Sequence, residues 1–156
     1  RLFRQAARQA TNLDVSLRGL TLLRPRFKAS AMMGTLFQVA LGGALGASGR
    51  YLTGVAAMRL MGPGFPWATL AVNVIGSFLM GVLVVAMAHL SATRFAPLLM
   101  TGLLGGFTTF SAFSLDALTL WERGQHSLAA AYVLASILLS LAAIVAGLTL
   151  ARSLVA

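Results

Sequence analysis

Four apolar stretches, separated by short connectors, dominate this chain of 156 residues. About 24 residues of α-helix, the shortest of the four, extend roughly 36 Å, which is enough to cross a lipid hydrocarbon core. Only 10% of the residues are charged, too few to cover a surface that faces water. The sequence therefore predicts an all-α integral membrane protein with four transmembrane helices. These helices are expected over residues 33–60, 67–90, 97–121 and 128–151.

Basic residues are concentrated before the first apolar stretch. Seven of the 12 lysines and arginines lie within the first 28 residues, where they would contact anionic lipid headgroups. We expect residues 1–31 to be a dispensable basic leader that is disordered or not part of the native protein, and residues 32–156 to be the transmembrane domain. The leader does not show the aromatic interleaving of a nucleic-acid surface, so no nucleic-acid partner is expected.

Charges at the ends of the predicted helices do not set an orientation. Arg94 and Arg152 lie on one side of the membrane and Arg59 and Arg123 on the other, so the positive-inside rule gives a tie. Either the leader alone fixes the orientation, or chains insert both ways and pair as an antiparallel dimer. Such a dimer would supply, in two chains, the inverted repeat of many transporters. The charges favour neither alternative.

Small residues recur four positions apart within the apolar stretches. Such pairs let helix backbones approach closely in lipid, and they predict tight packing and oligomerisation. The pairs are Gly42/Gly46, Ser77/Gly81 and Ala143/Gly147.

The third apolar stretch contains two adjacent glycines and two β-branched threonines within residues 105–109. These residues make a poor continuous helix. The sequence favours a break here over a continuous helix whose glycine pair admits a neighbour. A break exposes backbone groups at membrane depth, which protein, water or an ion must satisfy. Freed carbonyls suit a cation, and the N-terminus of the resuming half-helix suits an anion.

Uncharged polar side chains form stripes inside the predicted helices. They are Thr69, Asn73 and Ser77 in the second stretch and Tyr132, Ser136 and Ser140 in the fourth. Each set shares one helical face because its members are four residues apart. In the third stretch, Phe110 and Phe113 share a face, and the edge of a phenyl ring is weakly positive. The stripes serve either as contacts between helices or as a chargeless pathway for a small anion.

Arg50 lies inside the first apolar stretch, where a charge is a functional candidate by default. It would either reach the interface by snorkelling or line a vestibule that attracts anions. Asp116 is the acidic residue within the predicted helices, late in the third, and would pair with Arg50 or sit at the water boundary. The chain has no cysteine, 2 histidines and 3 acidic residues, so an enzyme is not expected.

Three motifs resemble those of the CrcB/Fluc fluoride channels over residues 34–152. They are GGALGASGRY at residues 42–51, WATLAVNVIGSF at residues 67–78 and GLLGGFTTFSAFSLD at residues 102–116. The resemblance implies an antiparallel, dual-topology homodimer of four-helix chains, with a broken third helix and two fluoride pores. It also implies a location in the bacterial inner membrane and passive export that relieves fluoride toxicity.

The same resemblance implies roles for individual residues. Asn73 matches the pore amide, and Phe110 and Phe113 match ring-edge contacts to fluoride. Arg50 matches a vestibule arginine. The polar track corresponds to Thr69, Ser136, Ser140 and, less closely, Tyr132. Backbone carbonyls of Gly105 and Thr108 would hold a structural Na⁺ at the dimer axis. The chain departs from the family at Ala112, where a hydroxyl residue is common, and at Asp116, where Glu is common.

Two other functions fit a small four-helix membrane protein. One is a dual-topology, proton-coupled multidrug exporter, which would need a carboxylate near the middle of the membrane, whereas Asp116 lies late in its stretch. The other is a non-transporting membrane assembly factor, in which the polar stripes would only hold helices together.

Overall fold

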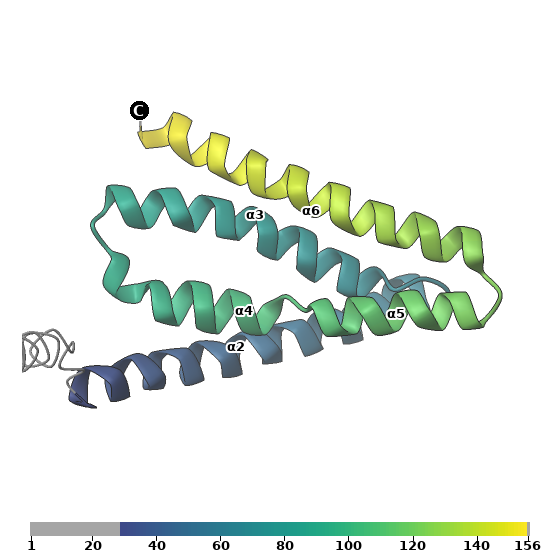
Figure 1. Cartoon of the computed structure of the whole chain (residues 1–156), viewed down its shortest axis with the longest axis horizontal. Helices are drawn as coiled ribbons and strands as arrows, with labels where there is room; N and C mark the ends of the chain where they lie inside the picture. Colours follow the sequence, from purple (N-terminus) through teal and green to yellow (C-terminus); the bar gives the residue numbers. More distant parts are fainter. Residues whose placement is uncertain (1–28, 156) are drawn as a thin grey trace, which may run out of the picture. The chain divides into compact units, whose positions relative to one another are not determined.

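The computed structural model describes residues 29–155, with side chains from residue 31 onward (Figure 1). Residues 33–155 belong to one compact unit. The basic leader predicted for residues 1–31 lies almost entirely outside the described residues, so its dispensability stays a prediction.

All regular elements within residues 29–155 are helices, as the sequence predicts. Four segments are long and apolar enough to cross a membrane, which confirms the four predicted spans and makes this a multi-pass membrane protein. These segments are Ala31–Met61, Trp67–His89, Thr93–Glu122 and His126–Val155. In chain order the elements are α2 (Ala29–Met61), α3 (Trp67–His89), η1 (Thr93–Phe95), η2 (Pro97–Leu104), α4 (Gly105–Phe107), α5 (Phe110–Glu122) and α6 (His126–Val155).

The third span is built from several pieces instead of one α-helix. It begins with the 3-10 turn η1, widens into the π-helix η2, and ends its first half with α4. Figure 1 shows a short extended segment between α4 and α5, which confirms the predicted break. The π-helix is not predictable from the sequence pattern. Pro97 stands at its first position, where a missing backbone N–H costs nothing.

Tight turns connect successive spans, so neighbouring spans run antiparallel. Gly62 (φ +75°) and Gly124 (φ +73°) adopt the left-handed conformation that glycine tolerates best. At the second of these turns, the N–H of Gly124 donates to the carbonyl of Trp121 over 2.9 Å. The short turn places α6 beside α5, and α6 also runs along α3 (Figure 1).

Glycines set the closest contacts between helices. A methyl group on Gly81 would overlap the carbonyl of Ile144, and one on Gly147 would overlap the carbonyl of Phe78, so α3 and α6 touch backbone to backbone. Gly42 and Gly46 bring α2 equally close to η2. These contacts confirm the close approach predicted from the spacing of small residues.

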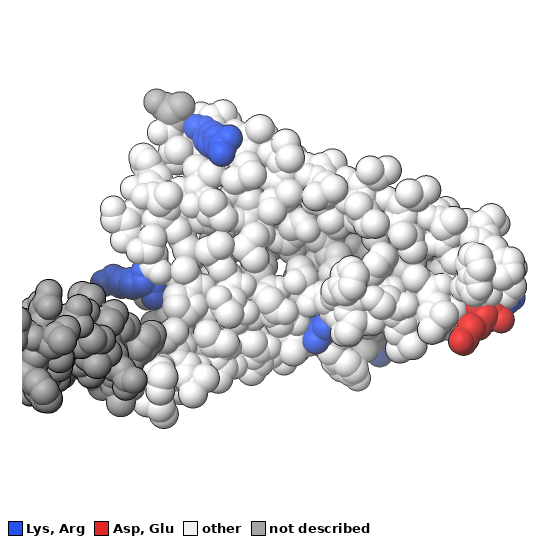
Figure 2. Space-filling model, in the orientation of Figure 1, with Lys and Arg blue, Asp and Glu red and all other residues white. Residues whose placement is uncertain are grey.

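The described outer surface is largely apolar. Figure 2 shows that Lys, Arg, Asp and Glu cover little of the visible face of residues 33–155. Some lie toward its two ends and others near the middle of its lower edge. Many large apolar side chains are exposed on the single chain, as expected of a surface that faces lipid. A small buried cluster lies between α5 and α6 and consists of Phe113, Leu120, Ala129 and Tyr132.

Candidate functional site

The candidate site is centred on the break in the third span. Helix α4 ends at Phe107 and α5 begins at Phe110. Between them, Thr108 (φ −80°, ψ 160°) and Thr109 (φ −156°, ψ 125°) are extended. The side chain of Thr109 caps the new helix by accepting a hydrogen bond from the N–H of Ala112 over 3.2 Å. The break is therefore an ordered interruption with its own cap.

The amide of Asn73 holds the broken backbone in place. Its Nδ2 donates to the carbonyl of Thr109 over 3.0 Å, and the N–H of Thr109 donates to its Oδ1 over 2.8 Å. Both backbone groups of Thr109 are thus satisfied by a side chain from α3. Because an amide nitrogen carries two N–H bonds, one N–H of Asn73 remains for another acceptor. Asn73 therefore links α3 to the break and still has one N–H that can donate to another group.

The same hydrogen bonds deprive two carbonyls of their helical partners. In a continuous α-helix, the carbonyl of Gly105 would accept from the N–H of Thr109, which instead donates to Asn73. The carbonyl of Thr108 would accept from the N–H of Ala112, which instead donates to the side chain of Thr109. Gly105 is also exposed on the single chain. Both carbonyls predicted to bind a cation thus belong to residues whose helical pairing is interrupted.

A groove of about 410 Å³ lies beside the break, and α3, α5 and α6 all contribute to it. It brings together most of the polar residues that the sequence placed on stripes. The stripe residues that line it are Asn73, Ser77, Ser136 and Ser140. Thr108 and Thr109 of the break and the rings of Phe110 and Phe113 line it as well. Ser136 is 5% exposed, and its Oγ has no hydrogen-bond partner among the described atoms. A buried hydroxyl without a partner is costly, which marks this position as a candidate ligand contact.

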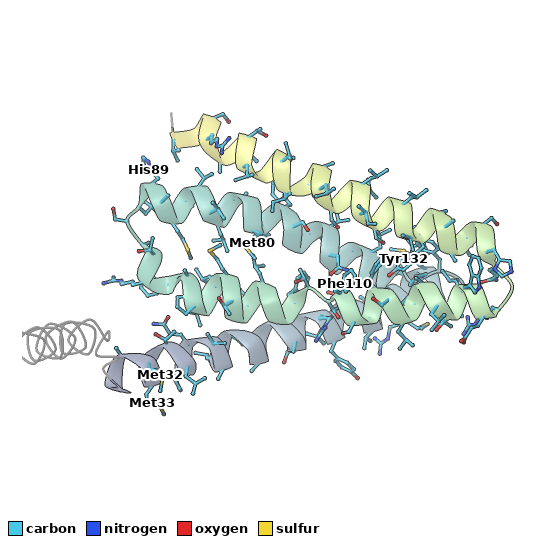
Figure 3. The ribbon with its side chains drawn as sticks, viewed as in Figure 1. Met32, Met33, Met80, His89, Phe110 and Tyr132 are labelled. Atoms are coloured by element: carbon cyan, nitrogen blue, oxygen red, sulfur yellow. The ribbon has the colours of Figure 1, made fainter. Side chains whose placement is uncertain are left out.

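The two phenylalanines of the third span differ sharply in exposure. Phe110 lies at the break (Figure 3) and is 78% exposed, whereas Phe113 is 9% exposed. Their ring centroids are 5.4 Å apart and their planes are inclined by 44°. Phe113 also packs on Tyr132 at 5.4 Å. The pair thus links the groove to the buried cluster between α5 and α6.

Thr69 and Tyr132 do not line the groove. The hydroxyl of Thr69 donates to Oδ2 of Asp116 over 2.6 Å, and the hydroxyl of Tyr132 donates to the same oxygen over 3.3 Å. The motifs of the sequence do not predict this group. Asp116 and Tyr132 are 16 residues apart, and Asp116 and Thr69 are 47 residues apart. The available signal was the cost of an isolated carboxylate in a span, which demands nearby donors.

Arg50 stands apart from both of these groups. It is half-buried on α2, and no carboxylate of residues 31–155 lies within ion-pair distance of it. The pairing of Arg50 with Asp116, one of two alternatives left open by the sequence, is therefore not formed. Asp116 instead lines a second cavity, which Arg59 and Arg123 share.

The four spans, the interrupted third helix and the polar groove beside it define a small multi-pass membrane protein with an ordered helix break at membrane depth. Comparison with known families agrees with this class. Residues 37–148 match the family described as CrcB-like protein, Camphor Resistance (CrcB). The chain belongs to this family, which confirms the resemblance found in its motifs.

Several bacterial relatives are similar over nearly their whole length. A protein of Cereibacter sphaeroides is 68% identical over 121 residues, which is 78% of this chain and 97% of the relative. One of Paracoccus denitrificans is 56% identical over 125 residues, or 80% of this chain and 100% of the relative. One of Agrobacterium fabrum is 58% identical over 118 residues, or 74% of this chain and 94% of the relative. Each of the three is named fluoride-specific ion channel FluC.

Proposed function

We propose that this protein is a fluoride-selective channel that passes fluoride across the membrane down its electrochemical gradient. Membership of the CrcB-like family and the names of the three relatives support the proposal. The observation that carries it is the groove beside the break. Its lining offers an amide, hydroxyls and ring edges, and none of the described residues that line it is Lys or Arg.

This set of donors suits a small, strongly hydrated anion. A pore must replace the water around fluoride without binding the ion so tightly that it cannot leave. Ser136 has an unpaired hydroxyl and Asn73 has a spare N–H, so both can donate to an anion in the groove. Fixed positive charges would hold the ion for longer. A chargeless track therefore favours rapid passage.

We place the other predicted residues around this centre. Phe110 and Phe113 would present ring edges to the ion. Ser140 would donate a hydroxyl to the ion one turn of α6 beyond Ser136. The track would extend through Thr69 and Tyr132 toward Asp116, to which both hydroxyls donate. Arg50, which has no ion-pair partner among residues 31–155, would attract anions to a vestibule.

The functional unit in this proposal is an antiparallel, dual-topology homodimer. The single chain leaves the carbonyl of Gly105, an exposed residue at membrane depth, without its helical partner, and lipid cannot satisfy it. Ser48, Ser111 and Ser114 are also exposed, although their hydroxyls are hydrogen-bonded within the chain. A second copy covering these residues would remove them from lipid. The equal numbers of arginines at the two ends of the spans are compatible with insertion in both orientations.

A Na⁺ ion at the dimer axis is part of the same proposal. The interrupted pairing of the Gly105 and Thr108 carbonyls makes them suitable ligands, because hard cations prefer oxygen donors. Each chain would contribute both carbonyls, and the bound ion would supply positive charge that holds the two chains together. Its removal is expected to weaken the dimer, which size-exclusion chromatography in sodium and in N-methylglucamine buffers would measure.

We further propose that the protein resides in the bacterial inner membrane and relieves fluoride toxicity by letting fluoride leave the cell. The relatives are bacterial, and the four spans suit a bilayer. Purified protein in liposomes tests the central claim. Vesicles loaded with fluoride are expected to lose it at once when a potassium ionophore balances the charge, whereas vesicles loaded with chloride should retain it.

The same assay separates the channel from its rivals. A proton-coupled exporter would require a pH gradient, and an assembly factor would give no flux in a purified system. Fluoride efflux that is absent, or that appears only when a pH gradient is imposed, would overturn the proposal.

A further inference from the structure

Gly76 lies on α3 at the point where the break in the third span packs against this helix. It is buried, and it lines the groove together with Thr108. A methyl group on Gly76 would overlap Cγ2 of Thr108. The next nearest atoms of the facing segment are Cδ1 of Phe107 at 3.5 Å and Cβ of Thr108 at 3.7 Å, which are ordinary van der Waals distances. The methyl group of Thr108 therefore occupies the space that a side chain at Gly76 would fill.

A hydrogen bond fixes the direction of that methyl group. Oγ1 of Thr108 donates to the carbonyl of Leu104 over 2.9 Å, which is the bond that a threonine commonly makes to the preceding turn of a helix. Because Oγ1 and Cγ2 are both attached to Cβ, this bond also sets where Cγ2 points, and a β-branched side chain has few other rotamers. Moving the methyl group away from Gly76 would require either that Thr108 turns and loses this bond or that α3 moves away from the break.

Helix α3 contacts both residues of the break through one helical face. Asn73 bonds both backbone groups of Thr109, and Gly76, three residues further along α3, receives the side chain of Thr108. The carbonyl of Thr108 and the N–H of Thr109 belong to the same peptide group, which lies between these two contacts. Its orientation therefore depends on both of them, because Asn73 holds the N–H and the contact with Gly76 holds the residue that carries the carbonyl.

We propose that Gly76 is a positioning residue: it admits the methyl group of Thr108 and so holds the peptide between Thr108 and Thr109 in the orientation that the break requires. Glycine is needed here because every other residue carries a Cβ atom that would displace this methyl group. The consequence for conduction rests on the proposed function, in which this peptide supplies a carbonyl to the cation and forms part of the groove wall.

A double-variant cycle that moves one methyl group across the contact tests the proposal. Gly76→Ala adds a methyl group, and Thr108→Ser removes one while keeping the hydroxyl. Hydrogen–deuterium exchange of the peptide covering residues 105–112, followed by mass spectrometry, reports whether the N–H groups of Thr109 and Ala112 stay bonded. Gly76→Ala should speed this exchange about fivefold or more, as expected for overpacking by one methyl group. In the Thr108→Ser background the same substitution should have little effect, and fluoride efflux per dimer should follow the same pattern.

Gly81→Ala is the matched control on the same helix. A methyl group on Gly81 would overlap the carbonyl of Ile144 and lie 2.9 Å from the N of Leu148, so both of its contacts are backbone. This variant should lower the thermal midpoint of unfolding. Thr108→Ser should not relieve that loss, because it removes no atom from the contact between α3 and α6.

Equal effects of Gly76→Ala in the parent and in the Thr108→Ser background would overturn the proposal, because the cost would then arise elsewhere. So would an exchange rate of the break that Gly76→Ala leaves unchanged. If Gly76→Ala alone gives no folded protein, recovery of the fold by Thr108→Ser supports the contact, and failure to recover it counts against the proposal. The exchange measurement needs no ion flux, so a parent protein that shows this pattern but conducts no fluoride would overturn the proposed function and leave the role of Gly76 in place.

Discussion

Asn73 satisfies both backbone groups of Thr109 and keeps one N–H for the groove. Asn73→Asp replaces this donor by an oxygen that faces the carbonyl of Thr109, and it adds a negative charge to an anion pathway. An unsatisfied buried group costs about 1–3 kcal/mol, so fluoride efflux should fall by about fivefold or more. Efflux from liposomes, normalised to the amount of dimer, measures this.

The control for Asn73→Asp makes the same chemical change outside the spans. Gln125 lies in the connector between α5 and α6 and is exposed. Gln125→Glu should therefore conduct fluoride like the parent protein. If Asn73→Asp also conducts normally with an unchanged dimer content, Asn73 has no part in the pathway.

Substitutions at Phe110 and Phe113 distinguish an effect on conduction from an effect on stability. Phe110 is 78% exposed on the single chain, whereas Phe113 is 9% exposed and packs on Tyr132. Isoleucine at either position removes a ring edge, so both variants should lower fluoride efflux. Phe113→Ile should lower the free energy of unfolding more than Phe110→Ile, by about 1–2 kcal/mol, because it alone loses core packing and the ring contact with Tyr132. Thermal unfolding in detergent, measured beside efflux, distinguishes the two effects.

The outcome that contradicts this distinction is equally clear. If both isoleucine variants unfold at the parent temperature and conduct like the parent, the two rings only fill space. If Phe110→Ile is the less stable of the pair, the exposure of Phe110 in a single chain does not describe its environment in the assembled protein.

The packing of α2 against the third span depends on glycine. A methyl group on Gly46 would overlap the carbonyl of Leu103 and lie 2.8 Å from the N of Phe107. Because both contacts are backbone, Gly46→Ala should separate the helices and lower stability by about 1–3 kcal/mol. Gly34→Ala on the same helix meets no atom within 4 Å, so it should be neutral or slightly stabilising. Equal thermal midpoints for the two variants would disprove this contact.

Elements that depend on local sequence were predictable. The four spans follow from runs of apolar residues, and the break follows from the low helix propensity of residues 105–109. Both signals are contained within a few turns of chain. The π-helix Pro97–Leu104 is different, because its residues are apolar like those of any transmembrane helix. Nothing in its composition distinguishes the hydrogen bonds of a π-helix, which join residues five apart, from those of an α-helix, which join residues four apart.

The residues of the candidate site were predictable from the sequence, but their hydrogen-bond partners were not. Asn73 was identifiable because an amide is rare in an apolar helix, yet its partner, the backbone of Thr109, is 36 residues away. Asp116 was recognisable as an unusual carboxylate, and Arg50 was the obvious charge to pair with it. The structure instead gives Asp116 two hydroxyl donors, because packing of α3 and α6 against α5 brings Thr69 and Tyr132 to it.

At the scale of the whole molecule, the proposed dual-topology dimer predicts mixed orientation in the membrane. Arg59 and Arg123 line one cavity at one end of the spans, and Arg94 and Arg152 lie in the sequence at the opposite ends. The chain contains no cysteine, so Gln125→Cys introduces a single thiol. About half of the copies should react with an impermeant maleimide from either side of the membrane. Ser91→Cys at the opposite end should give the same fraction, whereas complementary all-or-none labelling would show one orientation.

Deletion of the basic leader tests whether fluoride conduction needs any part of the chain outside the spans. Every proposed site residue lies after residue 31, and the family match begins at residue 37. Deletion of residues 1–31 should therefore leave fluoride efflux per dimer unchanged. Because the leader contains seven of the 12 basic residues, it is also the strongest positive-inside signal, and its removal should leave orientation to the balanced arginines. The deletion in the Gln125→Cys background measures both effects, and a folded deletion variant without efflux would show that the leader takes part in conduction.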